Sequence, residues 1–222
     1  MKSQQKLRLA VLASGGGTNL QSIIDQSRQG LLNAEIHLVI SNNPGAGALT
    51  RATQAGIKTA CINHREFDSR ESFDQQVIAT LQAAQIDLVV LAGFMRIISA
   101  PFLQAFPQKI INIHPSLLPA FPGLHVQQKA IDYGAKFSGC TVHFVDDGVD
   151  TGPIIVQSVV PVHPEDTEES LAARILEQEH KIYPQSIQWI AEGRVKIFNR
   201  QVKITASENP TEALTNPAPT ED

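Results

Sequence analysis

The segment LRLAVLASGGGTNLQSII, residues 7–24, decides the fold. Its first seven residues are apolar except Arg8, a pattern typical of a strand covered on both faces. From 19 to 29 the apolar side chains return at helical spacing, with Leu20 and Ile23 on one face. Three glycines join the two patterns. The segment therefore predicts a buried strand, a tight turn and a helix.

The same alternation continues outward from this unit. Short apolar runs typical of buried strands occur at 34–41, 57–62, 86–93 and 109–114. Helical patterns lie between them, including one through about residue 84 that we expect Asp68 and Glu71 to open as a capping box. This order predicts an α/β, Rossmann-like fold with a twisted, mainly parallel sheet and helices on both faces. Ligands of such sheets bind at the carboxyl ends of the strands.

The pattern changes toward the C-terminal half. The runs 139–147 and 152–162 are joined by an acidic loop too short for a crossover helix, so they predict an antiparallel pair. A long helical pattern follows, capped by Asp166 or Thr167, and Pro184 is expected to kink it. Two short strand patterns after residue 194 predict a terminal hairpin or edge strands.

Composition and charge restrict the class of protein. The 222 residues are 42% hydrophobic and 18% charged, with a net charge of −4. All of that surplus lies in 205–222, which contains four acidic residues and neither Lys nor Arg. We therefore expect one neutral domain over 1–204, a disordered tail over 205–222, and no nucleic-acid or membrane binding. Two distant cysteines and the lack of a signal-like apolar run indicate a cytoplasmic protein.

The glycine loop SGGGTN, residues 14–19, allows a ligand to approach the backbone closely at a helix N-terminus. Such a turn can bind phosphate. It matches neither the dinucleotide fingerprint, because a third spaced glycine is missing, nor a P-loop, because no GK[ST] follows. The alternative is a purely structural turn with Thr18 or Asn19 as N-cap. The residues alone leave both interpretations open.

The segment INIHPSLLPAFPG, residues 111–123, carries the second candidate site. Asn112 and His114 point the same way by the period of two, at the carboxyl end of a strand. A carboxamide and an imidazole aimed at one point can stabilise an oxyanion and donate a proton. The alternative is a strand end with a structural histidine.

Three carboxylates, Asp146, Asp147 and Asp150, lie in the loop between the antiparallel strands. One of them could fix the tautomer of His114 and favour its charged form, or the loop could be a solvated turn. No metal-loop spacing is present, so we predict no metal. Glu179 and His180 are by themselves typical of a helix surface. Because no nucleophile elbow occurs, direct transfer between two bound substrates is favoured over covalent catalysis.

Six motifs taken together, SGGGTNL, DSRE, VVLAGFMRI, NIHPSLLPAFPG, TVHFVDDGVDTGPII and EQEHKIYP, resemble the folate-dependent phosphoribosylglycinamide formyltransferases. The resemblance extends from about residue 8 to 198 and implies a formyltransferase fold, with a nucleotide-binding half over about 7–110 and a folate-binding half over about 111–204. It implies formyl transfer from 10-formyltetrahydrofolate to glycinamide ribonucleotide in purine biosynthesis.

The resemblance also implies roles for individual residues. The catalytic residues would be Asn112, His114 and Asp150. Residues for the ribonucleotide would be Gly17, Thr18, Asn19 and Glu179. Residues lining the folate site would be Arg70, Met95, Arg96, Ile97, Ile98, Asn112, Asp146, Asp147, Gly148, Val149 and Asp150. Apolar Leu176 departs from the family pattern, which puts a side-chain phosphate contact there in doubt.

Other functions stay open at this point. A formyltetrahydrofolate deformylase shares similar Asn, His and Asp residues but has a regulatory domain ahead of them. A methionyl-tRNA formyltransferase adds a C-terminal RNA-binding barrel, where this chain has 17 acidic, proline-containing residues after Thr205. A non-enzymatic phosphosugar-binding module would have no use for Asn112 and His114. The expected oligomeric state is a monomer or a homodimer.

Overall fold

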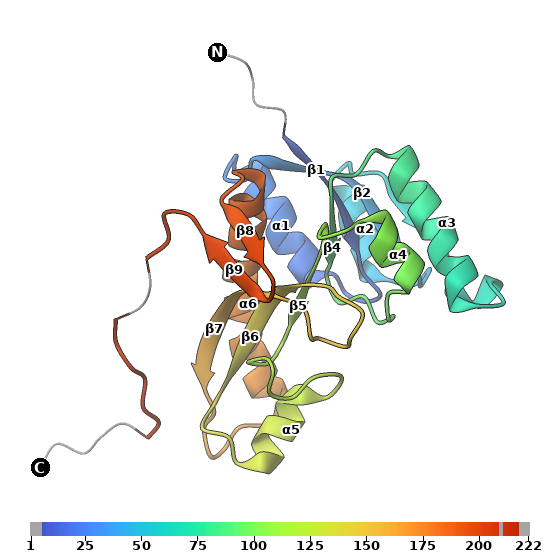
Figure 1. The fold of residues 1–222 in the computed structure, drawn as a ribbon. Coiled ribbons are helices and arrows are strands. Elements are labelled where there is room, and N and C mark those ends of the chain that lie inside the picture. Colours follow the sequence, from blue (N-terminus) through green and yellow to red (C-terminus); the bar gives the residue numbers. More distant parts are fainter. Residues whose placement is uncertain (1–5, 209–210, 218–222) are drawn as a thin grey trace, which may run out of the picture.

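A computed structural model describes residues 6–208 and 211–217. Its strands form one sheet in the order β3-β2-β1-β4-β5-β6-β7-β9-β8 (Figure 1). The strands are β1 (Leu7–Leu12), β2 (Ala34–Ser41), β3 (Thr59–Cys61), β4 (Leu88–Leu91), β5 (Ile110–His114), β6 (Phe137–Phe144), β7 (Ile154–Pro161), β8 (Val195–Phe198) and β9 (Gln201–Ile204). The helices are α1 (Thr18–Arg28), α2 (Gly47–Gln54), η1 (His64–Glu66, a 3₁₀ turn), α3 (Arg70–Ala83), α4 (Ala100–Ala105), α5 (Val126–Tyr133) and α6 (Glu168–Ala191).

The strand directions confirm the predicted topology. β3, β2, β1, β4 and β5 pair in parallel. β6 pairs antiparallel with both β5 and β7, and β8 and β9 form the terminal hairpin. β5 and β6 run in opposite directions, and His114 at the carboxyl end of β5 pairs with Thr141 in the middle of β6. Residues of the antiparallel half can therefore reach the strand-end edge where α/β folds bind ligands.

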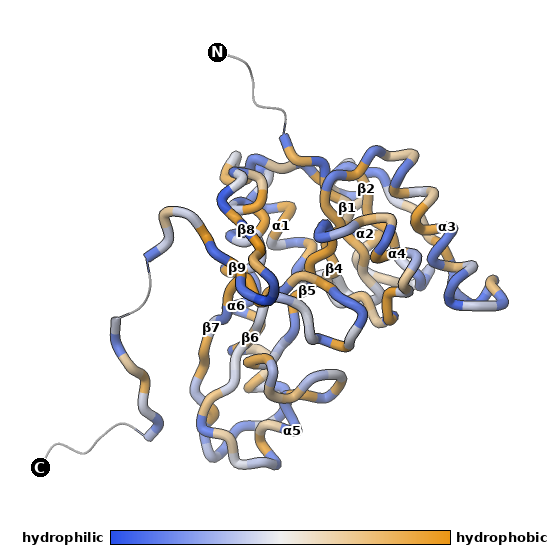
Figure 2. Tube along the Cα trace, viewed as in Figure 1, coloured by the Kyte–Doolittle hydropathy of each residue, from blue (hydrophilic) through white to orange (hydrophobic). Residues whose placement is uncertain are grey.

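Helices cover both faces of the sheet, as the sequence predicts. α1, α2 and the second half of α6 pack on one face, and α3 and α4 pack on the other. α5 and the first half of α6 cover β6 and β7 with a smaller apolar cluster. Hydrophobic residues accordingly concentrate along the central strands, while hydrophilic residues recur along the outer helices (Figure 2).

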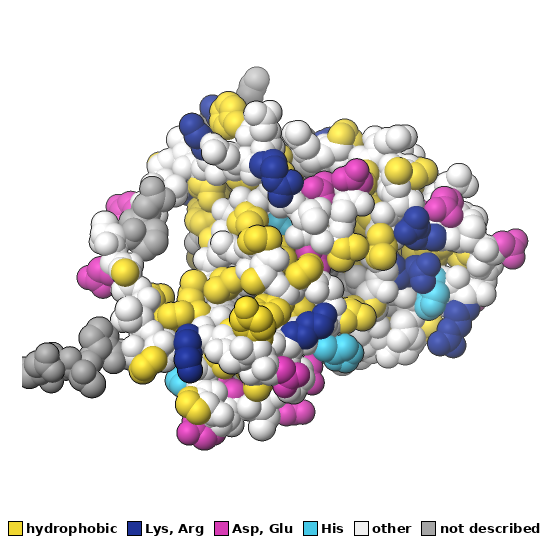
Figure 3. Space-filling model, turned by 60° about the horizontal axis from the view of Figure 1, so that its bottom comes forward, with side chains coloured by type: hydrophobic (Ala, Val, Ile, Leu, Met, Phe, Trp, Pro, Cys, Tyr) yellow, Lys and Arg dark blue, Asp and Glu magenta, His cyan; other side chains and the backbone are white. Residues whose placement is uncertain are grey.

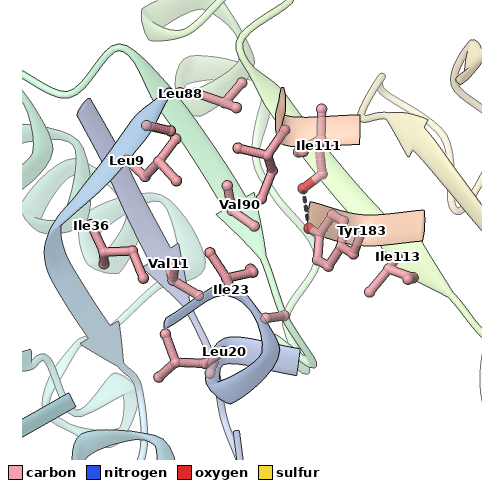
Figure 4. Packing of buried hydrophobic residues seen from close by; sticks show 14 of the residues in the cluster. Leu9, Val11, Leu20, Ile23, Ile36, Leu88, Val90, Ile111, Ile113 and Tyr183 are labelled. Atoms are coloured by element: carbon pink, nitrogen blue, oxygen red, sulfur yellow. Dashed lines mark hydrogen bonds between the residues drawn. The ribbon is translucent and has the colours of Figure 1, made fainter. Parts of the chain in front are cut away.

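A buried tyrosine fixes the long helix α6 to the centre of the sheet. Tyr183 is fully buried, and its hydroxyl lies 2.8 Å from the carbonyl oxygen of Leu91 and 3.2 Å from that of Ile111. Figure 4 shows the hydrogen bond to Ile111. These carbonyls belong to neighbouring strands β4 and β5. The hydroxyl thus satisfies its own hydrogen-bonding needs while joining the helix to both strands. The helix continues through Pro184, and the predicted kink stays a prediction.

Two helix starts differ from the sequence predictions. The N-cap of α3 is Ser69, which forms a reciprocal capping box with Ser72, so the predicted box of Asp68 and Glu71 is wrong by one residue. The motif DSRES offers both pairs at the same spacing, and only the backbone conformation selects between them. At α1 the N-cap is Gly17 in a left-handed conformation with no side-chain cap, so neither Thr18 nor Asn19 has the alternative capping role.

The tail is hydrogen-bonded to the domain at two places. At its start, Nε and Nη2 of Arg194 donate to the carbonyl oxygens of Thr205 and Ala206, at 2.8 and 2.9 Å. Asn216 donates through Nδ2 to the carbonyl oxygens of Lys136 and Val162, at 2.5 and 3.2 Å. Its described residues otherwise have high exposure and no regular structure. Residues 1–5, 209–210 and 218–222, which fall within the predicted domain start and disordered tail, lie outside the described residues. Among the helices in the described ranges, none has the length and apolarity needed to cross a membrane.

Candidate active site

The glycine loop stands between β1 and α1 and leaves the start of α1 open. Gly17 has φ +75°, and a Cβ atom there would lie 2.8 Å from Cα and Cβ of Ala48. This conformation and close packing against α2 explain the need for glycine. Because Gly17 caps α1 without a side chain, the first N–H groups of the helix are left available to an anion.

Glu179 lies beside this helix start and is not the surface residue that its sequence context suggested. It is 6% exposed, and its Oε2 accepts from Nδ2 of Asn19 at 2.7 Å. Burial raises the pKa of Glu179, and the hydrogen bond from Asn19 partly opposes that shift. Glu179 lies one helical turn before Tyr183, so the anchored helix holds its carboxyl group against the glycine loop.

His114, the last residue of β5, faces oxygen atoms through both ring nitrogens. Its Nδ1 is 3.3 Å from Oδ2 of Asp150, and its Nε2 is 3.0 Å from the carbonyl oxygen of Phe121. Neither partner can donate a proton, so the arrangement fits an imidazolium with an N–H toward each oxygen. The side chains of His114 and Asp150 are only 6% and 13% exposed, which strengthens the attraction between their charges.

Asn112 has a partner that the sequence analysis missed, His143 on β6. The two residues face each other in the β5–β6 pairing, and Nδ2 of Asn112 is 3.2 Å from Nε2 of His143. Nδ1 of His143 lies 2.8 Å from the carbonyl oxygen of Phe144, so Nδ1 carries the proton and Nε2 accepts from Asn112. Burial is the main cause of a lowered pKa for His143, which favours this neutral form.

The loop after β5 holds this cluster in shape through its backbone. Phe121 has φ +52°, an uncommon conformation for a non-glycine residue, and it presents its carbonyl oxygen to His114. The amide of Gly123 donates to Oδ2 of Asp150 at 2.9 Å. The hydroxyl of Thr141 donates to the carbonyl oxygen of Ser116 at 2.7 Å and thereby ties the loop to β6. Two loops and two strands thus converge on His114 and Asp150.

The residues predicted to line the folate site form a mixed group. Met95 and Ile97 are 66% and 57% exposed, whereas Ile98 is buried. The guanidinium of Arg96 lies 5.1 Å from the centre of the Phe73 ring. Val149 is half exposed on the 146–150 loop. Exposed apolar side chains next to a polar cluster fit a flat, partly apolar ligand. Figure 3 shows apolar side chains gathered over the middle of the forward face, with acidic and histidine side chains among them.

Some predicted site residues are not in contact with this cluster. Arg70 begins α3, and its recorded side-chain hydrogen bond goes to Glu71 at 3.4 Å. Asp146 accepts from Thr151 and from the amide of Gly148, which shapes its own loop, and Asp147 is exposed. The described residues include no group of three or more His, Cys, Asp or Glu side chains placed to hold a metal ion. The side chains of Asn112, His114 and Asp150 offer hydrogen bonding and proton transfer.

The arrangement defines an α/β protein with a donor cluster and an open helix start at the carboxyl edge of its sheet, and comparisons with known proteins agree. The formyl transferase family profile matches residues 7–187. The chain is 52% identical over 199 residues to the trifunctional purine biosynthetic protein adenosine-3 of Drosophila melanogaster, covering 89% of this chain and 15% of that protein. It is 44% identical to the phosphoribosylglycinamide formyltransferase of Haemophilus influenzae, covering 94% of this chain and 99% of that one.

Solved structures give the same result. Glycinamide ribonucleotide transformylase 1 of Symbiobacterium toebii superposes with a TM-score of 0.89 at 50% identity, covering 90% of this chain and 94% of that one. A formyltetrahydrofolate deformylase of Pseudomonas syringae superposes with a TM-score of 0.84 at 27% identity, covering 90% of this chain and 66% of that one. This chain belongs to the formyl transferase family. It spans less than a fifth of the length of its trifunctional relatives.

The partner of Asn112 gives a first prediction. We expect His143→Phe to lower kcat about five- to tenfold, because Asn112 loses the hydrogen bond that orients its carboxamide. The KM values for both substrates should change less than about twofold. His143→Gln, which retains an acceptor, should recover part of the loss. Steady-state kinetics with melting temperatures measures this. An equal loss in a fully folded Gln variant would show that orientation of Asn112 is not the cause.

Proposed function

We propose that this protein transfers the formyl group of 10-formyltetrahydrofolate to the amino group of glycinamide ribonucleotide, giving formylglycinamide ribonucleotide and tetrahydrofolate. The observation that carries the proposal is the pairing of His114 with Asp150, close to Asn112. These residues lie at the carboxyl edge of the sheet, where the glycine loop and the segment with exposed Met95 and Ile97 also begin. The same edge therefore offers a binding site for a phosphorylated ligand at the glycine loop, a binding site for a flat, partly apolar ligand at Met95 and Ile97, and the hydrogen-bond donors Asn112 and His114.

The chemistry of the transfer requires a stabilised oxyanion. The substrate amine attacks the formyl carbon, a carbon–nitrogen bond forms, and the carbonyl electron pair moves onto oxygen. Asn112 and His114 are the donors proposed to hold this oxygen. Nδ2 of Asn112 has two hydrogens and uses one toward His143, so the other stays available. Donors fixed before the reaction lower the barrier because they need not reorganise as charge develops.

Collapse of the oxyanion requires a proton donor. The bond to the folate nitrogen breaks and this nitrogen gains a proton, while the attacking nitrogen passes its surplus proton to the spent donor, which is thereby restored. We assign the donation to imidazolium His114, with Asp150 as its counter-charge. Nε2 of His114 is held by the carbonyl oxygen of Phe121, so delivery through this nitrogen requires an exchange of that hydrogen bond.

The remaining predicted residues bind the two substrates in this proposal. Gly17, Thr18 and Asn19 at the open start of α1 hold the phosphate, and buried Glu179 holds the ribose and glycinamide end. Met95, Arg96, Ile97 and Ile98 line the folate site, with Arg70 at its edge. The loop residues Asp146, Asp147, Gly148, Val149 and Asp150 complete it. The donor is a co-substrate, and no metal takes part in the proposed reaction.

The acceptor of the formyl group is the decisive measurement. The protein should be assayed with 10-formyltetrahydrofolate and, in turn, glycinamide ribonucleotide, water and charged initiator tRNA. We expect transfer to the ribonucleotide to exceed the other two reactions by orders of magnitude. Hydrolysis at a comparable rate would favour a deformylase, for which the likeness to the Pseudomonas syringae structure gives a specific reason. Transfer to the tRNA would contradict both.

The proposed phosphate-binding site at the glycine loop gives a second prediction. In Gly17→Val the new side chain meets Ala48 and is strained at positive φ, so the loop must move. We expect the KM for glycinamide ribonucleotide to rise about tenfold or more, with the KM for the folate nearly unchanged. Gly30→Val is the matched control, because Gly30 also has positive φ but open space around its Cβ position. A parallel rise for both substrates would contradict the assignment.

A further inference from the structure

Arg51, on α2, contacts the glycine loop on the side that faces α2. It was not among the predicted site residues. Its Nε donates to the carbonyl oxygen of Gly16 at 2.8 Å, and its Nη1 donates to Oε1 of Gln21 at 3.3 Å. It is half-buried, and no carboxylate pairs with it within the described part of the chain. A guanidinium cation therefore stands against the loop with its charge uncompensated.

Arg51 and the amide of Ala48 each hold one carbonyl oxygen of the glycine loop. The carbonyl oxygen of Gly15 accepts from the amide of Ala48 at 3.0 Å, and that of Gly16 accepts from Arg51, so both carbonyls are turned toward α2. In residues 6–208 and 211–217, the N–H groups of Gly15, Gly16 and Gly17 have no recorded acceptor. Successive free N–H groups with their carbonyls turned away form an anion-binding concavity.

A groove of about 460 Å³ beside α1 connects Arg51 with the start of the helix. Thr18, Ser22 and His180 also line it. The buried atoms Nε2 of His180 and Oδ1 of Asn19 lack hydrogen-bond partners among the described residues. Since buried polar atoms are ordinarily hydrogen-bonded, Nε2 of His180 indicates that a polar ligand or water completes the groove, and Oδ1 of Asn19 is a second free acceptor at the start of α1.

One carboxylate, that of Asp25, also lines the groove. Its Oδ1 accepts from Nε2 of Gln21 at 2.8 Å, so it is joined to Gln21 and not to Arg51. Burial lowers the pKa of His180, with Asp25 opposing the shift, so His180 adds little positive charge at neutral pH. Among the side chains lining the groove, Arg51 is therefore the source of fixed positive charge that an anion would experience.

We propose that Arg51 makes the site specific for a phosphorylated acceptor. It fixes the Gly16–Gly17 peptide with its N–H toward the anion, and it supplies the positive charge that a phosphate dianion requires. This inference rests on the proposed function, since it concerns the phosphate of the same substrate. Arg51 is a specificity-determining residue that acts through the loop, and it has no part in the formyl transfer step.

The test compares two acceptors that differ only in the phosphate, glycinamide ribonucleotide and glycinamide riboside. We expect Arg51→Gln to lower kcat/KM for the ribonucleotide roughly 10–100-fold, because a charged hydrogen-bonding group beside the phosphate is lost. The value for the riboside should change less than about twofold. Arg51→Lys should lie between, since it keeps the charge but not the planar fork of donors.

Arg28→Gln is the matched control. It removes the same charge from the far end of α1, about 15 Å along the helix, and should leave both acceptors unaffected. Equal losses of Arg51→Gln on both acceptors would overturn the inference, because they would indicate a structural role. So would a wild-type enzyme that uses the riboside as well as the ribonucleotide.

A binding measurement separates this inference from the proposed function. Inorganic phosphate should perturb the backbone amide NMR signals of Gly15, Gly16 and Gly17 in the wild type, and at least tenfold higher concentrations should be needed in Arg51→Gln. A wild type that transfers no formyl group to the ribonucleotide would refute the proposed function, while this titration would still test Arg51. Equal titrations in the two proteins would overturn the inference.

Discussion

His114→Ala should lower kcat for formyl transfer by about 100–10,000-fold, the range expected for loss of a positioned proton donor. The variant loses the proton donor, one oxyanion donor and the counter-charge of Asp150 at once. Binding of both substrates, measured by calorimetry, should change far less, because the predicted binding residues lie on other segments. Single-turnover kinetics measures the chemical step without interference from product release.

A second substitution separates the two parts of this loss. His114→Gln keeps an N–H donor for an oxyanion but cannot deliver a proton at neutral pH, so it should retain more activity than His114→Ala and still fall far below the wild type. His163→Gln, at an exposed position, is the control. A His114→Gln enzyme with more than a tenth of wild-type kcat would show that another group supplies the proton.

The sheet could be predicted from the sequence because its central strands are mostly apolar, with few polar interruptions such as Arg8 in β1 and Glu35 in β2. The runs at 34–41 and 109–114 match β2 and β5 to within one residue, since strands buried on both faces leave few polar positions to obscure their ends. Helix starts were harder. DSRES contains two overlapping capping boxes, and the choice of Ser69 over Asp68 depends on backbone angles that the sequence pattern does not specify.

Some residues of the candidate site could likewise be predicted from the sequence, and others could not. Asn112 and His114 share a strand, so the period of two alone places them at one edge. His143 could not be placed, because its position opposite Asn112 depends on the register of β5 against β6. A histidine inside the apolar run TVHFV was the available signal. Glu179 depends on helix packing, since the anchoring of Tyr183 turns its carboxyl group inward.

The loop carboxylate Asp150 could be proposed as a partner of His114 only as one of several alternatives. Three acidic residues lie within five positions, and sequence spacing does not say which one reaches the imidazole. In the structure Asp146 caps its own turn, Asp147 is exposed and Asp150, at φ +56°, is directed inward. The difference arises from backbone conformation in the loop, which brings Oδ2 of Asp150 to both His114 and the amide of Gly123.

Asp150→Asn should therefore lower kcat near neutral pH by about tenfold or more while leaving the shape of the cluster intact. The asparagine can still accept from the amide of Gly123 through its oxygen, but it has no charge to hold the imidazolium of His114.

The sign of the pH dependence follows from that loss. A carboxylate favours the protonated form of a neighbouring imidazole, so removing it depletes the active form as pH rises, and the alkaline limb of the kcat profile should move toward lower pH. Lowering the pH should restore part of the activity of Asp150→Asn, which a purely structural defect would not allow. Asp147→Asn, at the exposed carboxylate of the same loop, is the control and should leave the limb in place. If both variants keep the wild-type profile and near-normal turnover, Asp150 is an ordinary loop carboxylate and the proposed catalytic residues reduce to Asn112 and His114.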